Sequence, residues 1–132
     1  MKKISVLLLL PLLFSCTNQG AKNNSSPFYQ AKGLYDRQWA EHKDDARYMV
    51  FIHEWLAFKN NNPPRAEEGR CYYLSDKSER FILVQDQHGV INKLIAENEN
   101  KKTKCFRAAL VGKKYPKPPI APFYHELTMA AP

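Results

Sequence analysis

The chain of 132 residues has few of the groupings from which catalytic and metal sites are built. Its three cysteines and four histidines form no CxxC, no HExxH and no other paired metal-ligand spacing. It contains neither the Gly-x-Ser-x-Gly motif of serine hydrolases nor a glycine-rich phosphate loop. The adjacent acidic pairs at positions 44–45 and 67–68 fit a helix start and a charged loop better than an acid and a base across a cleft. The sequence therefore predicts neither an enzyme nor a bound metal or cofactor.

Long apolar runs are also lacking, except for one at the N-terminus that is too short for a permanent membrane-spanning helix. Lys2 and Lys3 precede an apolar run over residues 4–14, which is the anatomy of a signal peptide. The run ends in LFSC at residues 13–16, and this stretch resembles the bacterial lipobox. The resemblance implies a lipoprotein signal peptide over residues 1–15, with cleavage and lipidation at Cys16. The alternative is a plain secretory signal in which Cys16 is an ordinary thiol.

Several acyl chains on one cysteine anchor a protein firmly, whereas a single chain binds a membrane only marginally. Thr17, and not an aspartate, follows Cys16. By analogy with lipoprotein sorting, this favours the periplasmic face of the bacterial outer membrane. Residues 17–27 have almost nothing to bury, so residues 16–33 are predicted to be the lipidated cysteine and a flexible tether. Residues 34–132 are then a single periplasmic domain.

Charge narrows the choice of partners. Removing the first 15 residues of the 132 takes away Lys2 and Lys3, which leaves 117 residues and lowers the formal charge from +7 to +5. A chain of this charge is drawn toward acidic proteins and anionic surfaces, and the expected compartment excludes nucleic acid. Seven basic residues near the C-terminal end form the largest charge feature: Lys101, Lys102, Lys104, Arg107, Lys113, Lys114 and Lys117. They are interpreted either as a solvated face or as a docking surface for an acidic segment or a lipid phosphate, with Lys101, Lys102, Lys104 and Arg107 as candidate partner-binding residues.

A helical pattern runs over residues 36–58, and two prolines follow it at positions 63 and 64. The apolar stripe expected to face the core is Ala46, Met49, Val50, His53, Leu56 and Ala57. His53 on this stripe is interpreted as a hydrogen-bonded histidine at the edge of the core.

Strands are expected at residues 71–74, 81–84 and 90–95, with a hairpin turn at 86–89 in which Gly89 takes a positive φ. A helix is expected over 98–111, with Phe106, Ala109 and Leu110 facing the sheet. The proline-rich residues 115–119 are predicted to run extended on the surface, and residues 123–127 to form a last turn of helix. The predicted fold class is α+β: a small antiparallel sheet of about three strands with helices packed on one face.

With Cys16 assigned to lipid, Cys71 and Cys105 remain, and in an oxidising periplasm two such cysteines indicate a disulfide. Closing a loop of this size contributes about 3 to 4 kcal/mol by the chain-entropy estimate. A shared metal is the competing interpretation, but neither cysteine has a CxxC or histidine partner nearby.

These elements together resemble a known family. Over about residues 46–127, the chain is similar to the C-terminal periplasmic domain of TolA, within the wider TonB C-terminal fold. The shared features, in chain order, are a helix, Gly-x-Cys, a hairpin with a glycine turn, a helical Cys-x-x-Ala-Ala-Leu and Pro-Lys-Pro-Pro. The matching positions are Gly69, Cys71, Gly89, Cys105, Ala108, Ala109, Leu110, Pro116, Lys117, Pro118, Pro119 and, more loosely, Tyr124. The resemblance implies the fold, the disulfide and partner binding through an exposed sheet edge.

Two departures from the family limit what it implies. The stretch between the cysteines is long enough for an extra strand or a longer hairpin. The inner-membrane helix and long helical stalk of TolA have no counterpart, so energy transduction is not implied. The expected function is an outer-membrane-anchored, non-catalytic protein-binding module whose partner is an envelope protein of a Tol-Pal or TonB-like system. The alternative is an inhibitory, immunity or exclusion lipoprotein that blocks an envelope component, such as a toxin or phage protein, through its basic surface.

Overall fold

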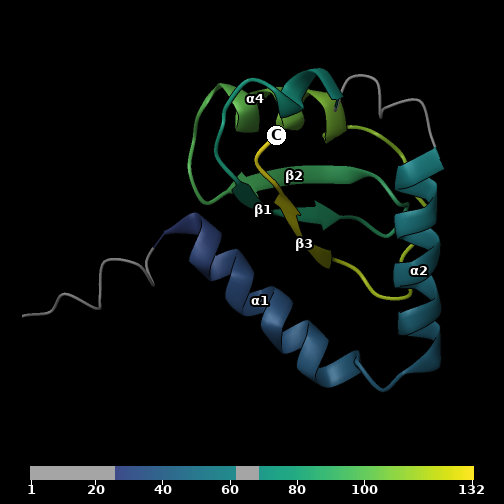
Figure 1. Ribbon diagram of the computed structural model, residues 1–132. Coiled ribbons are helices and arrows are strands. Elements are labelled where there is room, and N and C mark those ends of the chain that lie inside the picture. Colours follow the sequence, from purple (N-terminus) through teal and green to yellow (C-terminus); the bar gives the residue numbers. More distant parts are fainter. Residues whose placement is uncertain (1–25, 62–68) are drawn as a thin grey trace, which may run out of the picture.

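The computed structural model describes residues 26–61 and 69–132. The predicted signal peptide, Cys16 and all of the predicted tether before residue 26 lie outside the described residues. The elements are α1 (Pro27–His42), α2 (Ala46–Asn61), β1 (Glu79–Gln85), β2 (Ile91–Ala96), α4 (Lys101–Leu110) and β3 (Phe123–Met129), arranged as Figure 1 shows.

The three strands form one antiparallel sheet in the order β2-β1-β3, so that β1 is central and β2 and β3 are the edges. In β1, Phe81 lies opposite Leu127 of β3, and Ile82 lies opposite Ile95 of β2. The α+β class predicted from the sequence, a small three-stranded antiparallel sheet with helices packed against it, is confirmed.

The hairpin between β1 and β2 turns at Gly89, as expected. Gly89 has φ +89°, and a Cβ at this position would lie 2.2 Å from the carbonyl oxygen of Tyr115. Asp86 closes the turn, because its Oδ1 accepts hydrogen bonds from the backbone N–H groups of His88 and Val90. Glycine is therefore required both by the backbone conformation and by the close approach of the segment that follows α4.

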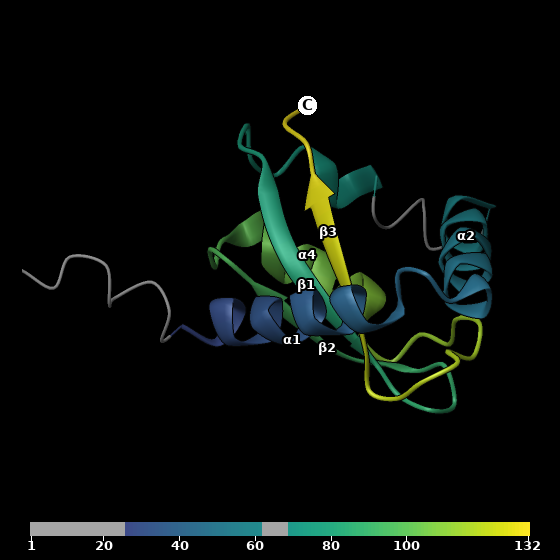
Figure 2. The same cartoon turned by 90° about the horizontal axis from the view of Figure 1, so that it is seen from below.

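Helices cover both faces of the sheet. Side chains alternate along a strand, so Phe81 and Leu83 point to one face and Ile82 to the other. Aromatic residues of α2 and α4 pack with Phe81 and Leu83, while Phe28 and Ala31 of α1 pack on Ile82. Figure 2 shows α1 crossing the sheet on the side opposite to α4. The expectation that all helices share one face is wrong for α1.

The folded region begins earlier than predicted, at α1 and not at residue 34. The side chain of Ser26 accepts a hydrogen bond from the backbone N–H of Tyr29, and a proline occupies the first turn, where its missing N–H costs nothing. The structure has two helices where a single helix was expected over residues 36–58, because residues 43–45 are not helical. Asp45 starts the second helix by accepting a hydrogen bond from the N–H of Arg47.

The buried stripe of α2 differs from the predicted stripe. Tyr48, Phe51 and Trp55 are buried, whereas Val50 and Leu56 are exposed, as is His53. Both sets follow helical spacing, and the set with the larger aromatic side chains faces the core because it removes more apolar area from water.

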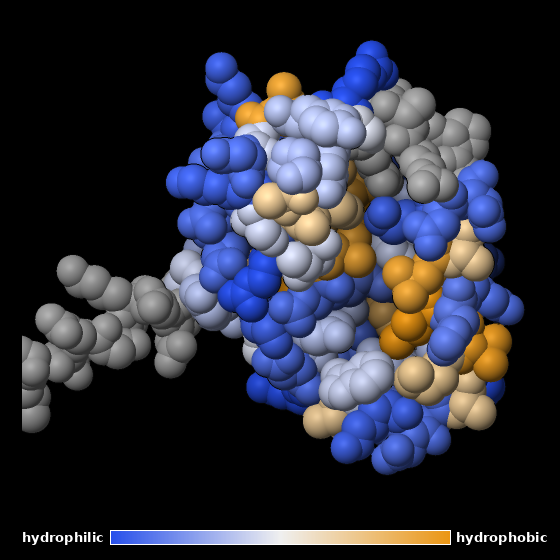
Figure 3. Space-filling view, in the orientation of Figure 1, coloured by the Kyte–Doolittle hydropathy of each residue, from blue (hydrophilic) through white to orange (hydrophobic). Residues whose placement is uncertain are grey.

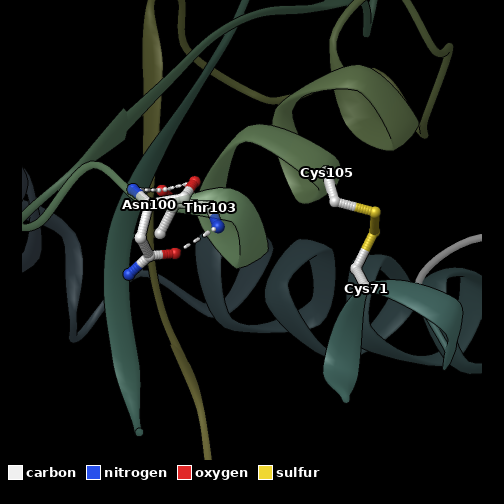
Figure 4. Close-up of a disulfide and its surroundings, with 4 residues drawn as sticks. All are labelled: Cys71, Asn100, Thr103 and Cys105. Carbon is white, nitrogen blue, oxygen red and sulfur yellow. Dashed lines mark hydrogen bonds between the residues drawn. A yellow bond between two sulfur atoms is a disulfide. The ribbon is translucent and has the colours of Figure 1, made fainter. Parts of the chain in front are cut away.

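The cysteine pair joins α4 to a short helical turn at residues 69–72, and not to the predicted strand at 71–74 (Figure 4). The sulfur atoms of Cys71 and Cys105 lie 1.98 Å apart, at bonding distance. Asn100 caps α4 by accepting a hydrogen bond from the N–H of Thr103, whose hydroxyl accepts one from the N–H of Asn100. The predicted inward residues Phe106, Ala109 and Leu110 are all buried.

The last predicted element is also different, since residues 123–127 belong to the edge strand β3 and not to a helix. Every second residue of this segment faces the core, namely Phe123, His125 and Leu127, and this is the periodicity of a strand. Before β3, residues 115–118 have no regular structure, as expected of the proline-rich segment, but Tyr115 is buried and not on the surface.

Candidate functional site

Two of the seven residues of the predicted basic surface are withdrawn from it, whereas Lys113, Lys114 and Lys117 are exposed. Lys101 and Lys104 are exposed, but Lys102 is fully buried, and its Nζ donates to the carbonyl oxygens of Lys77 at 2.8 Å and Ala130 at 3.0 Å. This ammonium also lies 5.0 Å from the ring centroid of Tyr72. Lys102 therefore ties the C-terminal segment to the loop before β1 and is not available to a partner.

Arg107 is engaged as well. Its guanidinium forms a bidentate ion pair with Glu99, and its Nε donates to the backbone carbonyl of Leu94 at 3.1 Å. The ion pair raises the pKa of Arg107 and lowers the pKa of Glu99. Of the four candidate partner-binding residues, two are thus used to build the domain.

Within residues 26–61 and 69–132, no three histidine, cysteine or acidic side chains come close enough together to hold a metal ion. None of the helices in this part of the chain is long and apolar enough to cross a membrane.

His125 is buried in an aromatic cluster, stacked on Trp55 with ring centroids 4.0 Å apart. Burial lowers the pKa of His125 to about 3.

The two edges of the sheet differ in how far their backbone groups are already paired. At β2, the N–H and the C=O of Ile91 bond to Lys113 and Gly112, and Arg107 donates to the C=O of Leu94. The segment after α4 therefore runs alongside the beginning of β2, and an isolated bridge pairs Val90 with Lys114. The beginning of the β2 edge and the C=O of Leu94 are therefore already paired.

At β3, one residue's backbone is paired by a side chain. The amide of Gln38 on α1 donates from Nε2 to the C=O of Tyr124 at 3.0 Å, and its Oε1 accepts from the N–H of Tyr124 at 2.9 Å. These two bonds show that the peptide groups of Tyr124 point away from β1, toward the open edge. Since the backbone direction alternates along an antiparallel strand, those of Glu126 and Thr128 point the same way.

The backbone N–H and C=O of Glu126 and Thr128 on this side have no hydrogen-bond partner among the described residues. An unpaired strand edge is a template for pairing with another chain. The C-terminal half of β3 is therefore an unpaired stretch of the sheet edge.

A cavity of about 100 Å³ opens beside this edge. Tyr35 of α1 lines one wall, apolar side chains of α2 line the other, and β3 forms the floor; the lining residues are Tyr35, Tyr48, Ile52, Trp55, Leu56, Phe123, Tyr124, His125, Glu126 and Leu127. Apolar surface gathers on α2 and toward the sheet in the space-filling view (Figure 3). Sites for small molecules usually enclose about 300 to 1,000 Å³, so this cavity suits one side chain of a larger partner.

Charged residues secure the α1 side of the same edge. Lys32 of α1 lies 3.4 Å from a carboxylate oxygen of Glu126, and Arg80 of β1 lies 3.8 Å from the other. Arg80 also forms a bidentate pair with Glu97, whose pKa falls to about 2 because of those hydrogen bonds. These ion pairs link α1 and β1 to the side chain of Glu126 on β3.

Known proteins add nothing to this geometry. Comparison with protein-family models, curated proteins and solved structures finds no match. The site must be interpreted from its own residues: the open half of β3, the cavity over Trp55 and His125, and Gln38 at one end. None of these was predicted as a site residue, because Gln38 carries no motif and the β3 segment was expected to be helical.

Proposed function

We propose that this chain is an outer-membrane-anchored periplasmic lipoprotein that acts as a non-catalytic protein-binding module, by adding a strand of its partner to the free edge of β3. The observation that carries the proposal is the unpaired backbone of Glu126 and Thr128 beside an apolar cavity. In strand addition, main-chain hydrogen bonds supply affinity and pockets for alternate side chains supply selectivity.

The anchor belongs to the proposal on sequence grounds alone, since Cys16 lies outside the described residues. The strand order β2-β1-β3, with a helix between β2 and β3, accommodates the resemblance to the TolA C-terminal domain. A partner in a Tol-Pal or TonB-like system is therefore the first candidate. The alternative of an inhibitory lipoprotein acting through its basic surface has less support, because Lys102 is buried and Arg107 is paired.

The decisive experiment removes one backbone donor from the edge. Thr128→Pro deletes an N–H that faces away from β1, and proline is tolerated on an edge strand at such a position. Thr128→Val keeps the N–H and removes only the hydroxyl. When each lipidated variant is used to purify envelope proteins, the wild type and Thr128→Val are expected to recover the same partner, and Thr128→Pro to lose it.

A second pair of variants separates the two candidate functions. Lys101→Glu combined with Lys104→Glu reverses the exposed charges of α4 and leaves β3 untouched. Partner recovery that survives Thr128→Pro but is lost in the double variant, and that weakens with salt, contradicts strand addition and favours the basic surface.

A further inference from the structure

Gln38 gives β3 the contact that a neighbouring strand would give. Its side-chain amide offers one donor and one acceptor to Tyr124, as the N–H and the C=O of one opposite residue do in an antiparallel ladder. The second Nε2 hydrogen donates to the Tyr48 hydroxyl at 3.0 Å. Gln38 is 7% exposed, so it has been withdrawn from water to make these three bonds.

The surroundings of Gln38 keep it in place. Tyr48 packs on Phe123 with ring centroids 5.3 Å apart and stacks on His42 at 5.6 Å. Removing a buried amide from such partners leaves unpaired polar groups behind, which is costly. Gln38 is therefore a fixed part of the edge.

We propose that Gln38 is a stop that ends the pairing of a partner strand at Tyr124 and thereby fixes the register in which the partner's side chains meet the cavity. This inference rests on the proposed strand addition at β3. Pairing is limited to positions 125–129 of β3, where only Glu126 and Thr128 offer free backbone groups.

The stop defines the chemistry of the partner. In an added strand, residues opposite His125 and Leu127 turn to the same face as those two side chains, where Ile52, Trp55 and Leu56 line the cavity. The partner is thus an extended segment with two apolar side chains two positions apart, one of which enters the cavity of about 100 Å³ while the other packs beside it on the same face. If the register slipped by one residue, both apolar side chains would move to the opposite face, beside Lys32 and Glu126.

A measurement on the domain alone tests the stop itself. In Gln38→Ala, the Tyr124 amide loses its partner, and its hydrogen exchange is expected to accelerate at least about tenfold, while the His125 amide, which faces β1, changes by less than about twofold. Gln38→Glu is the matched control, because a carboxylate of the same length still accepts from the Tyr124 N–H. Gln38→Ser, too short to reach Tyr124, repeats the Ala test if Gln38→Ala does not fold. Unchanged exchange of Tyr124 in both short variants overturns the proposal.

A strand supplied within the chain tests the register. A flexible Gly-Ser linker and the segment Thr-Val-Thr-Val-Thr are added after Pro132, which places the probe at an effective concentration of the order of millimolar. With Gln38 present, the probe is expected to slow exchange at Glu126 and Thr128 about tenfold and to leave Tyr124 unaffected. In Gln38→Ala, the slowing is expected to reach Tyr124. A Pro-Val-Pro-Val-Pro probe, which lacks N–H donors at the positions that face β3, is expected to protect none of the three.

The outcomes separate this inference from the function on which it rests. If the probe slows exchange at Glu126 and Thr128 in Gln38→Ala but never at Tyr124, strand addition stands and the stop is overturned. If the Thr-Val probe protects none of these amides in any variant, strand addition at this edge is overturned together with its register.

Discussion

Among the described residues, the apolar cluster on the face of the sheet that carries Phe81 and Leu83 contains twelve buried residues, from α2, α4, the strands and the connecting segments. The apolar cluster on the other face consists of Ile82 with Phe28 and Ala31. Polar contacts replace apolar area on the second face: Tyr29 with Glu97, Lys32 with Glu126 and Gln38 with Tyr124. Apolar burial contributes far more than exposed ion pairs. We infer that the first face holds the domain together and the second face positions α1 beside the open edge of β3.

The largest expected effect comes from opening the first face. Phe81→Ala removes a fully buried ring that packs 5.7 Å from Phe106, and should lower the free energy of unfolding by about 3 to 5 kcal/mol. Phe28→Ala is the matched variant on the second face, where the ring is equally buried. Phe28→Ala should lower the free energy of unfolding by about 2 kcal/mol. The loss is smaller because α1 has few apolar neighbours and can shift to fill the space that the ring leaves. Urea unfolding with the disulfide intact measures both, and equal losses would mean that the two faces do not differ.

The second effect is a pH dependence that comes from the first face. His125 has a folded-state pKa of about 3, lowered by burial from its usual 6.5, so it stays neutral in the folded protein while it takes up a proton in the unfolded chain. Stability is therefore complete above about pH 6.5 and decreases as the pH falls toward 3, by about 1 kcal/mol per pH unit. The rings that pack on His125 belong to Phe51, Trp55 and Phe123. None of these side chains carries a carboxylate that would stabilise a charged imidazole.

His125→Phe tests this dependence. The ring stack on Trp55 is kept, while the hydrogen bond between the His125 Nε2 and the Gln85 Oε1 is lost. Absolute stability should fall, but its slope between pH 7 and pH 5 should become flatter by about 2 kcal/mol in total. His53→Gln removes an exposed imidazole and serves as the control. A slope that is unchanged in His125→Phe would assign the acid sensitivity to other groups.

Parts of the first face were predictable from the sequence, whereas the second face was not, for a physical reason. The hairpin at Gly89 and the inward side of α4 follow from turn chemistry and helical spacing, which are local properties. The stripe of α2 was misassigned because two sets of residues share the same spacing, and only packing decides which set is buried. Residues 71–74 were expected to form a strand because of their aromatic residues, but this preference is weak and depends on context. Tertiary contacts, including the disulfide of Cys71, outweigh it, and residues 69–72 are helical.

Contacts between distant residues explain what was missed at the candidate site. Gln38 and Tyr124 are 86 positions apart, and a glutamine on a polar helix gives no sign that it will pair with a strand. β3 was misassigned because its inward residues are a phenylalanine, a histidine and a leucine, a short alternation in which the central residue is usually polar. The family resemblance led to the hypothesis of partner binding through a sheet edge, which stays a prediction, and it did not indicate which edge is unpaired.

The smallest expected effect lies on the second face, at the ion pair of Glu97. This carboxylate accepts from Arg80 at 2.8 and 2.9 Å and from the Tyr29 hydroxyl at 2.8 Å, and the side chain of Glu97 is 23% exposed. Glu97→Gln should cost about 1 kcal/mol at low salt and less at high salt, because a partly exposed pair is screened. Since the folded pKa of Glu97 is lowered to about 2, the difference from wild type should be complete above about pH 4.5 and disappear as the pH falls toward 2. Glu99→Gln, at a carboxylate that is 51% exposed and pairs with Arg107, is the control and should cost less. A Glu97→Gln effect that is independent of salt, or as large as that of Phe28→Ala, would show that polar contacts and not the small apolar cluster hold α1 in place.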